Sequence, residues 1–297
     1  MNFKNFTDEM KKQVQARLGE GKVVELRSVL KFNNVRLCGL TITEEGKNIS
    51  PTIYLESFYE AYCRGASLSA IVDALVDSYL NVPLKESVDV SFFKNFEKVK
   101  GRIAYRLLNV EKNRELLADV PFIPYLDLAI CFFYSFGDMA AGEGSILIRR
   151  SHMEMWNTDV RELFLLAQEN TRKLFPVDLM RMQTLLEGML GDEGKEMPDE
   201  MEQVNIYVLT NTKRVQGAAA MLYPDVLAEL AGKLGSSFFI IPSSVHELIL
   251  VPFRKDISVS ALKNMIYEVN HTQLGPEDVL SDSLYAYDGN DKRIIKL

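Results

Sequence analysis

The chain has 297 residues, of which 47% are hydrophobic and 25% are charged. These proportions are ordinary for a globular protein, so they exclude a disordered chain, a collagen-like repeat and a coiled-coil rod. Lys and Arg number 34 while Asp and Glu number 41, and the formal net charge of -7 argues against a dedicated nucleic-acid-binding protein.

No targeting or membrane-spanning segment is evident in the sequence. Residues 1–20 are charged and lack an apolar run, and the apolar stretches elsewhere fall short of the roughly 18 residues that cross a membrane. Three cysteines, Cys38, Cys63 and Cys131, are widely spaced and form no C-x-x-C pair, so each is expected to be a small buried apolar residue. We expect a cytoplasmic protein with no membrane association, no metal and no cofactor.

The first third of the chain predicts helices around a β-hairpin. Residues 3–18 have apolar side chains at helical spacing. Alternating apolar residues flank the Asn33-Asn34 pair, which tolerates positive φ, and this pattern predicts a hairpin. A helix that starts at Pro51 and a second helix over 68–79 follow. These elements predict an N-terminal α+β domain at residues 1–88.

The middle third predicts a mixture of strands and helices, because its apolar spacing changes repeatedly between periods. An acidic loop poor in large apolar residues closes this region at residues 191–202. The expected elements before that loop are a strand at 103–107, a helix at 111–118, a buried strand at 125–136, a Gly-rich connection at 137–144, a returning strand from 146 to as far as 153, and helices at 159–174 and 177–190.

The last third predicts two consecutive strand-strand-helix units and a final hairpin over 285–295, which turns at Asp288-Gly289-Asn290. Each unit has two short apolar runs followed by a helical stripe. The first unit is expected to have strands at 206–208 and 218–222 and a helix from Pro224, and the second to have strands at 237–241 and 248–251 and a helix at 258–270. The whole chain is therefore expected to be α+β, with mixed, largely antiparallel sheets and flanking helices, and its second domain to span 89–297.

One turn, Pro242–Glu247, combines a hydroxyl, an imidazole and a carboxylate, the groups of assisted nucleophilic catalysis. Serine in a turn commonly bonds its own backbone, so a structural turn is favoured over a polar binding site and a binding site over catalysis. Leu250 stands where a zinc-protease motif would need its second histidine. The candidate ligand-binding residues are Ser243, Ser244, His246, Glu247, Asn211 and Asn270.

Two other motifs resemble binding sites. The segment 137–144 resembles a phosphate loop, but its acidic residues would repel phosphate and a flexible connection is favoured. The Arg149-Arg150 pair with His152 and Trp156 could stack on a base or pair with an acidic ligand. A solvated strand end with Trp156 packed beneath it is the favoured interpretation.

Several stretches resemble a family of proteins of unknown function from anaerobic Firmicutes of the Clostridia, and the likeness extends over nearly the full length. The stretches are 51–55, 106–109, 207–211, 241–247 and 276–282. The resemblance implies no established activity and no catalytic residues. It does imply a frequent association with integrated mobile elements, and hence an accessory or host-interaction role.

Two functional hypotheses follow from the sequence. The first is a nonenzymatic binding or accessory protein with a protein partner, because every strong catalytic or cofactor signature is missing from the sequence. The alternative is a small-ligand binder or an enzyme that uses the Ser243–Glu247 turn.

Overall fold

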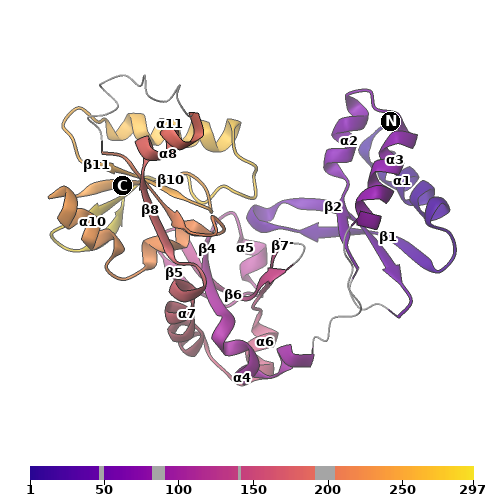
Figure 1. Ribbon diagram of the computed structural model, residues 1–297, viewed down its shortest axis with the longest axis horizontal. Coiled ribbons are helices and arrows are strands. Elements are labelled where there is room, and N and C mark those ends of the chain that lie inside the picture. The colour runs from indigo at the N-terminus through magenta and orange to yellow at the C-terminus, as the bar shows by residue number, and fades with distance from the viewer. Residues whose placement is uncertain (47–49, 82–90, 140–141, 191–204) are drawn as a thin grey trace. The chain divides into compact units, whose positions relative to one another are not determined.

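The computed structural model describes residues 1–46, 50–81, 91–139, 142–190 and 205–297 (Figure 1). Its fold is α+β, with antiparallel sheets and flanking helices, and this confirms the predicted fold class.

The chain divides into two compact units. The first unit comprises Met1–Lys94 and Asp138–Gly144, and the second comprises Asn95–Gly137 and Ser145–Leu297. The domain boundary predicted between residues 88 and 89 and the acidic loop predicted at 191–202 both lie outside the described residues.

The first unit combines a three-stranded sheet with helices. The strands lie in the order β1-β2-β3, with bounds β1 (Lys22–Leu30), β2 (Arg36–Glu44) and β3 (Thr52–Tyr54). The helices described in this unit are α1 (Phe3–Leu18), α2 (Glu56–Cys63) and α3 (Leu68–Asn81), with short 3₁₀ helices at Phe32–Asn34 and Ser91–Lys94.

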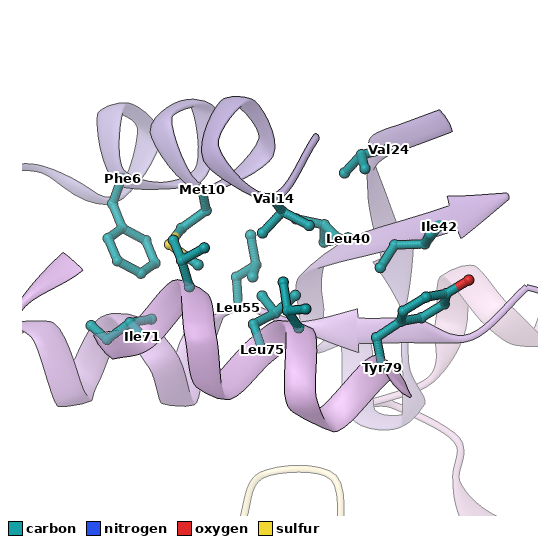
Figure 2. Packing of buried hydrophobic residues seen from close by; sticks show 12 residues of the cluster. Phe6, Met10, Val14, Val24, Leu40, Ile42, Leu55, Ile71, Leu75 and Tyr79 are labelled. Carbon is teal, nitrogen blue, oxygen red and sulfur yellow. The ribbon is translucent and has the colours of Figure 1, made fainter. Parts of the chain in front are cut away.

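The core of the first unit lies between α1, α3 and the sheet. Phe6 and Met10 of α1 and Leu75 of α3 project toward each other, and Leu40 of β2 closes the cluster (Figure 2). All four side chains are fully buried. The apolar stripes at 3–18 and 68–79 therefore predicted both helices and the faces that they bury.

The turn between β1 and β2 also follows its sequence prediction. Asn33 and Asn34 have φ of 55° and 59°, the left-handed region that asparagine tolerates better than most residues. Lys31 N–H donates to Val35 O at 2.8 Å across this turn. The hairpin is thus confirmed.

The prediction that a helix starts at Pro51 is wrong, because Thr52–Tyr54 forms the third strand. Tyr54 pairs with Gly39 of β2, and the Leu55 N–H donates to Cys38 O at 3.0 Å. The helix begins at Glu56, whose carboxylate accepts a hydrogen bond from Cys38 N at 2.6 Å. Pairing with β2 outweighs the local helix signal, and that pairing is a tertiary effect.

A six-stranded sheet forms the C-terminal part of the second unit. Its strands lie in the order β13-β12-β10-β11-β9-β8, with bounds β8 (Val177–Arg181), β9 (Tyr207–Asn211), β10 (Phe238–Pro242), β11 (Leu248–Pro252), β12 (Tyr285–Asp288) and β13 (Arg293–Lys296). A second sheet has the order β4-β6-β5 with β7 beside β6, and its strands are β4 (Ile103–Asn109), β5 (Phe122–Tyr125), β6 (Leu128–Met139) and β7 (Gly142–Leu147).

Helices cover these sheets. They are α4 (Phe96–Val99), α5 (Arg114–Leu117), α6 (Arg150–Trp156), α7 (Val160–Leu174), α8 (Met182–Leu190), α10 (Val226–Leu234) and α11 (Val259–Thr272), with 3₁₀ helices at Lys100–Arg102 and Gly217–Leu222. None of the helices within the described ranges is long and apolar enough to cross a membrane.

Two helices have clear packing roles. Ile266 of α11 packs onto Phe239 and Ile241, so α11 covers one face of the six-stranded sheet (Figure 1). Thr171 of α7 accepts a hydrogen bond through its hydroxyl from Tyr105 N at 3.0 Å. That bond satisfies an N–H on the edge of β4 that β6 does not use, and so protects the edge from other strands.

Three predictions in the middle third are wrong in part. The Gly-rich connection is shorter than the predicted 137–144, because strand β6 continues to Met139 and strand β7 begins at Gly142. The returning strand stops at Leu147, and Arg150–Trp156 is helical, because the Arg149 N–H is capped by His152 Nδ1 at 3.2 Å and Trp156 packs against Phe96. The helix predicted at 177–190 begins with strand β8, which pairs with β9. The last two departures also depend on partners distant in the sequence, which are Phe96 for Trp156 and β9 for β8.

The second predicted strand of the first strand-strand-helix unit is also wrong. Gly217–Leu222 is a 3₁₀ helix. The other predicted strand-strand-helix motif is confirmed as β10, β11 and α11. A Cβ at Gly217 would overlap Thr210 Oγ1 and the His246 carbonyl. The backbone there lies too close to the neighbouring strand and turn for any larger residue.

The Asp127 carboxylate links the two sheets of the second unit. It accepts hydrogen bonds from Ser281 Oγ at 2.7 Å, Ser283 Oγ at 3.0 Å and Tyr285 Oη at 2.9 Å. Asp127 follows Leu126, whose φ of 56° forms the tight β5–β6 turn. The β5–β6 turn is thereby bonded to β12 of the six-stranded sheet and to the segment that leads into it.

Gly217→Ala is expected to lower the free energy of unfolding of the second unit by about 3 kcal/mol, because the new methyl group overlaps backbone atoms. Gly232→Ala in α10 is the matched control: its Cβ meets open space, so the change should stabilise by up to about 1 kcal/mol. Denaturant unfolding followed by emission of Trp156, the chain's one tryptophan, reports on this unit. Equal effects of the two changes would refute the close-approach argument.

Asp127→Ala is expected to lower the free energy of unfolding by about 3 kcal/mol, because three hydroxyl donors lose a charged acceptor. Asp256→Ala removes an exposed carboxylate paired with Arg254 and should cost less than about 1 kcal/mol. The same fluorescence measurement compares them. If Asp127→Ala cost no more than Asp256→Ala, the carboxylate would not be holding the two sheets together.

Candidate functional site

The Ser243–Glu247 turn connects β10 to β11 and is fixed by backbone hydrogen bonds. Ser244 N–H donates to Glu247 O at 3.2 Å, which closes the turn. The buried Val245 donates through its N–H to Asp278 O at 2.8 Å and accepts from Ala218 N at 3.2 Å. The turn is therefore held between the 3₁₀ helix and the segment that precedes β12.

The side chains of the turn bond one another and the neighbouring backbone. Ser243 Oγ donates to Glu247 Oε1 at 3.2 Å, and Ser244 Oγ accepts from His246 N at 3.0 Å. Neither serine hydroxyl donates to the imidazole. The arrangement therefore lacks the nucleophile–base hydrogen bond that assisted attack by serine requires.

The imidazole of His246 is engaged through both of its nitrogens. Nδ1 accepts from Gln216 N at 3.3 Å, and Nε2 lies 3.4 Å from Asp278 Oδ1. An acceptor role for Nδ1 places the proton of the neutral ring on Nε2, facing the carboxylate. The ring is held as a bridge between two backbone segments, and its side chain is 38% exposed.

Asn211 shapes the loop that follows β9. Its Nδ2 donates to Val215 O at 2.8 Å, and its Oδ1 accepts from Lys213 N at 3.0 Å. The preceding residue, Thr210, donates through its hydroxyl to His246 O at 2.8 Å. The structure thus brings the loop of Asn211 beside the predicted turn, with the Asn211 amide committed to its own loop.

Asn270 lies on α11 and bonds a different segment. Its Nδ2 donates to Ser281 O at 3.0 Å and to Asp282 Oδ1 at 2.8 Å, and neither bond reaches the Ser243–Glu247 turn. Burial acts to raise the pKa of the Asp282 carboxyl, but hydrogen bonds from Asn270 and Lys112 outweigh it and lower that pKa. Asn270 therefore orients an acidic side chain. That the six candidate residues form a ligand site stays a prediction.

Sequence reasoning missed Asp278 and Gln216, the residues that contact the His246 ring. Gln216 has φ of 54° and lies 30 positions before His246, while Asp278 lies 32 positions after it. The stretch 276–282 carries part of the family resemblance, but no spacing rule connects it to the turn.

Two adjoining cavities of about 480 and 420 Å³ lie away from this turn, along α10. Both are lined by Ala228, Tyr287 and Lys292. Small residues on one side of α10, including Gly232, leave the first cavity open. Arg293 and Ile294 of β13 line the second. The alanine and glycine residues on one face of α10 are the sequence signal from which a cavity beside this helix could have been predicted.

The Arg149–Trp156 segment does not present a stacking face. Trp156 is 7% exposed and lies against Phe96 and His152, at ring-centroid distances of 5.7 Å in both cases. Arg149 pairs with Asp119, and Arg150 Nε donates to Ala118 O at 3.3 Å. The predicted packing of Trp156 is confirmed, although the segment is a helix start and not a strand end.

The cysteines differ in burial, which corrects the expectation that all are buried. Cys131 is fully buried, and burial raises the pKa of its thiol to about 12. Cys38 is half-buried and Cys63 is exposed. Within the described ranges, no group of three or more His, Cys, Asp and Glu side chains is arranged to hold a metal ion.

Comparison with known proteins places the chain in a family. Neither a curated protein nor a solved structure matches it. A family model described as "Family of unknown function (DUF5688)" matches residues 3–289, nearly the whole chain. The chain therefore belongs to the DUF5688 family of unknown function.

Proposed function

We propose that this chain is a nonenzymatic binding protein whose partner is another protein. One observation carries the proposal. The groups at the candidate turn that could perform chemistry are bonded to each other and to the neighbouring backbone: Ser243 to Glu247, Ser244 to the His246 N–H, and the His246 ring to Gln216 and Asp278.

Such bonding disfavours catalysis for a physical reason. A general base must offer an unshared nitrogen to the proton that it takes, and a nucleophile must face that base. His246 Nδ1 already accepts a backbone N–H, and its Nε2 faces a carboxylate. Catalysis would require the turn to break bonds that hold β10, the 3₁₀ helix and residue 278 together.

A second candidate function, a small-ligand binder or enzyme at this turn, is favoured by one observation. The side chains of His246 and Asp278 are 38% and 48% exposed, so a small molecule could reach an imidazole oriented by a carboxylate. In that case Nε2 would exchange its contact with Asp278 for one with the ligand.

The proposal also covers where the protein is located and what role it has. We infer a cytoplasmic protein, supported by three cysteines that are all free thiols. An accessory role in mobile elements of anaerobic Firmicutes rests on the family resemblance alone.

The test compares wild type with His246→Ala/Glu247→Ala. Tagged full-length chains are expressed in the native host, cross-linked, and their partners quantified by mass spectrometry. We expect the same protein partner at the same yield with both chains, because binding does not use the turn. Thermal unfolding of the purified chains first establishes that both are folded.

The opposing outcome is equally specific. In a thermal-unfolding panel of nucleotides, metals and central metabolites, a ligand at about 100 times its dissociation constant stabilises by roughly 2.7 kcal/mol. A ligand that stabilises wild type by this amount and leaves the folded double variant unchanged would overturn the nonenzymatic proposal and support a site at the turn.

A further inference from the structure

We propose that the outer edge of β13 is the docking site for an extended, acidic segment of the protein partner, which adds to the six-stranded sheet as a further strand. This inference rests on the proposed function and deepens it. It combines a strand edge that has no neighbour in the described sheet, a cavity beside that edge and a local positive charge.

The register of the sheet shows which backbone groups face outward. Leu297 N–H donates to Leu284 O at 2.9 Å, so these two residues form a hydrogen-bonded pair of the β12–β13 ladder. Such pairs alternate in antiparallel strands, which makes Ala286–Ile295 hydrogen-bonded and Tyr287–Ile294 not. The N–H and C=O groups of Ile294 and Lys296 therefore point away from β12, and β13 is the last strand in the order of the described sheet.

The cavity of about 420 Å³ lies on one face of this edge. Ile294 and Tyr287 line it, together with Leu222 and Pro224 of the neighbouring segment. A residue of an added strand that pairs with Ile294 projects its side chain to the same face. An apolar side chain at that position would enter the cavity, so main-chain bonds and a side-chain pocket act together, as they do in strand addition generally.

The positive charge of the β13 edge favours an acidic binding segment. Lys292 and Lys296 flank Ile294 and form no ion pair with the residues that the structure describes, while Arg293 pairs with the exposed Asp291. Acidic side chains complement this edge in a chain that is otherwise acidic, with a net charge of -7. A second copy of β13 is a poor occupant, because antiparallel pairing of the two outward-facing Ile294 residues places Lys292 of one copy opposite Lys296 of the other.

The probe, called the Val–Glu peptide, is a fluorescein-labelled Thr-Glu-Thr-Val-Thr-Glu-Thr, titrated with the full chain and followed by fluorescence anisotropy. When its Val pairs with Ile294, its two Glu side chains project to the same face as Lys292 and Lys296, because side chains alternate along a strand. The Val–Lys peptide, with Lys in place of both Glu, is the charge control. Two further peptides are N-methylated on Val and both Glu, or on the intervening Thr. If Val pairs with Ile294, the N–H groups of Val and Glu face β13, so their methylation should weaken binding at least tenfold and methylation of Thr should leave it unchanged.

Variants of the chain test the same edge. Ile294→Pro removes an outward N–H without removing a bond to β12, and is expected to weaken binding of the Val–Glu peptide about tenfold. Lys292→Glu/Lys296→Glu should weaken it by at least as much and strengthen binding of the Val–Lys peptide. Lys255→Glu, an exposed lysine outside the edge, is the matched control and should have little effect. Thermal unfolding checks that each variant is folded.

Several results would overturn the inference. These are no peptide binding at millimolar chain, equal binding of both N-methylated peptides, displacement of the peptide by inorganic phosphate, or sedimentation showing dimers that the peptide does not dissociate. If the partner found in the cross-linking experiment binds Ile294→Pro and the double lysine variant normally, the edge inference fails while the proposed function stands. If no protein partner is found, the proposed function fails whatever the peptides do.

Discussion

The Asp127 carboxylate is the contact on which the second unit depends most. By accepting from Ser281, Ser283 and Tyr285, it fixes the segment that leads into β12. Asn270 holds the same segment from α11, and its beginning, at Asp278, meets the Ser243–Glu247 turn. One carboxylate therefore anchors a segment that contacts the Ser243–Glu247 turn at one end, through Asp278, and continues into β12 at the other.

This architecture separates two surfaces with different properties. At the Ser243–Glu247 turn, the polar groups are satisfied internally and serve to join three segments of backbone. At β13, the backbone groups of Ile294 and Lys296 have no strand beside them in the described sheet, and a cavity and two lysines lie next to them. A surface that binds a partner needs unsatisfied or open groups, and β13 offers them where the turn does not.

Sequence patterns predicted the elements whose signal is local. The stripes of α1 and α3, the Asn33-Asn34 turn and the hairpin around Gly289 needed no distant partner. Patterns failed at β3, at β8 and at Gly217–Leu222, where pairing or close approach to a distant strand decides the conformation. At the candidate site, the residue types of the turn were visible, but the contacts of His246 with Gln216 and Asp278 span about 30 positions and follow from the fold alone.

Amide hydrogen exchange measured by NMR, with and without the Val–Glu peptide, tests the central claim that β13 accepts a further strand. The amides of Ile294 and Lys296 point outward and those of Ile295 and Leu297 point toward β12. The account predicts that the peptide slows exchange of Ile294 and Lys296 strongly while Ile295 and Leu297, already bonded, change little. Equal slowing along the whole strand, or protection confined to the Ser243–Glu247 turn, would contradict it.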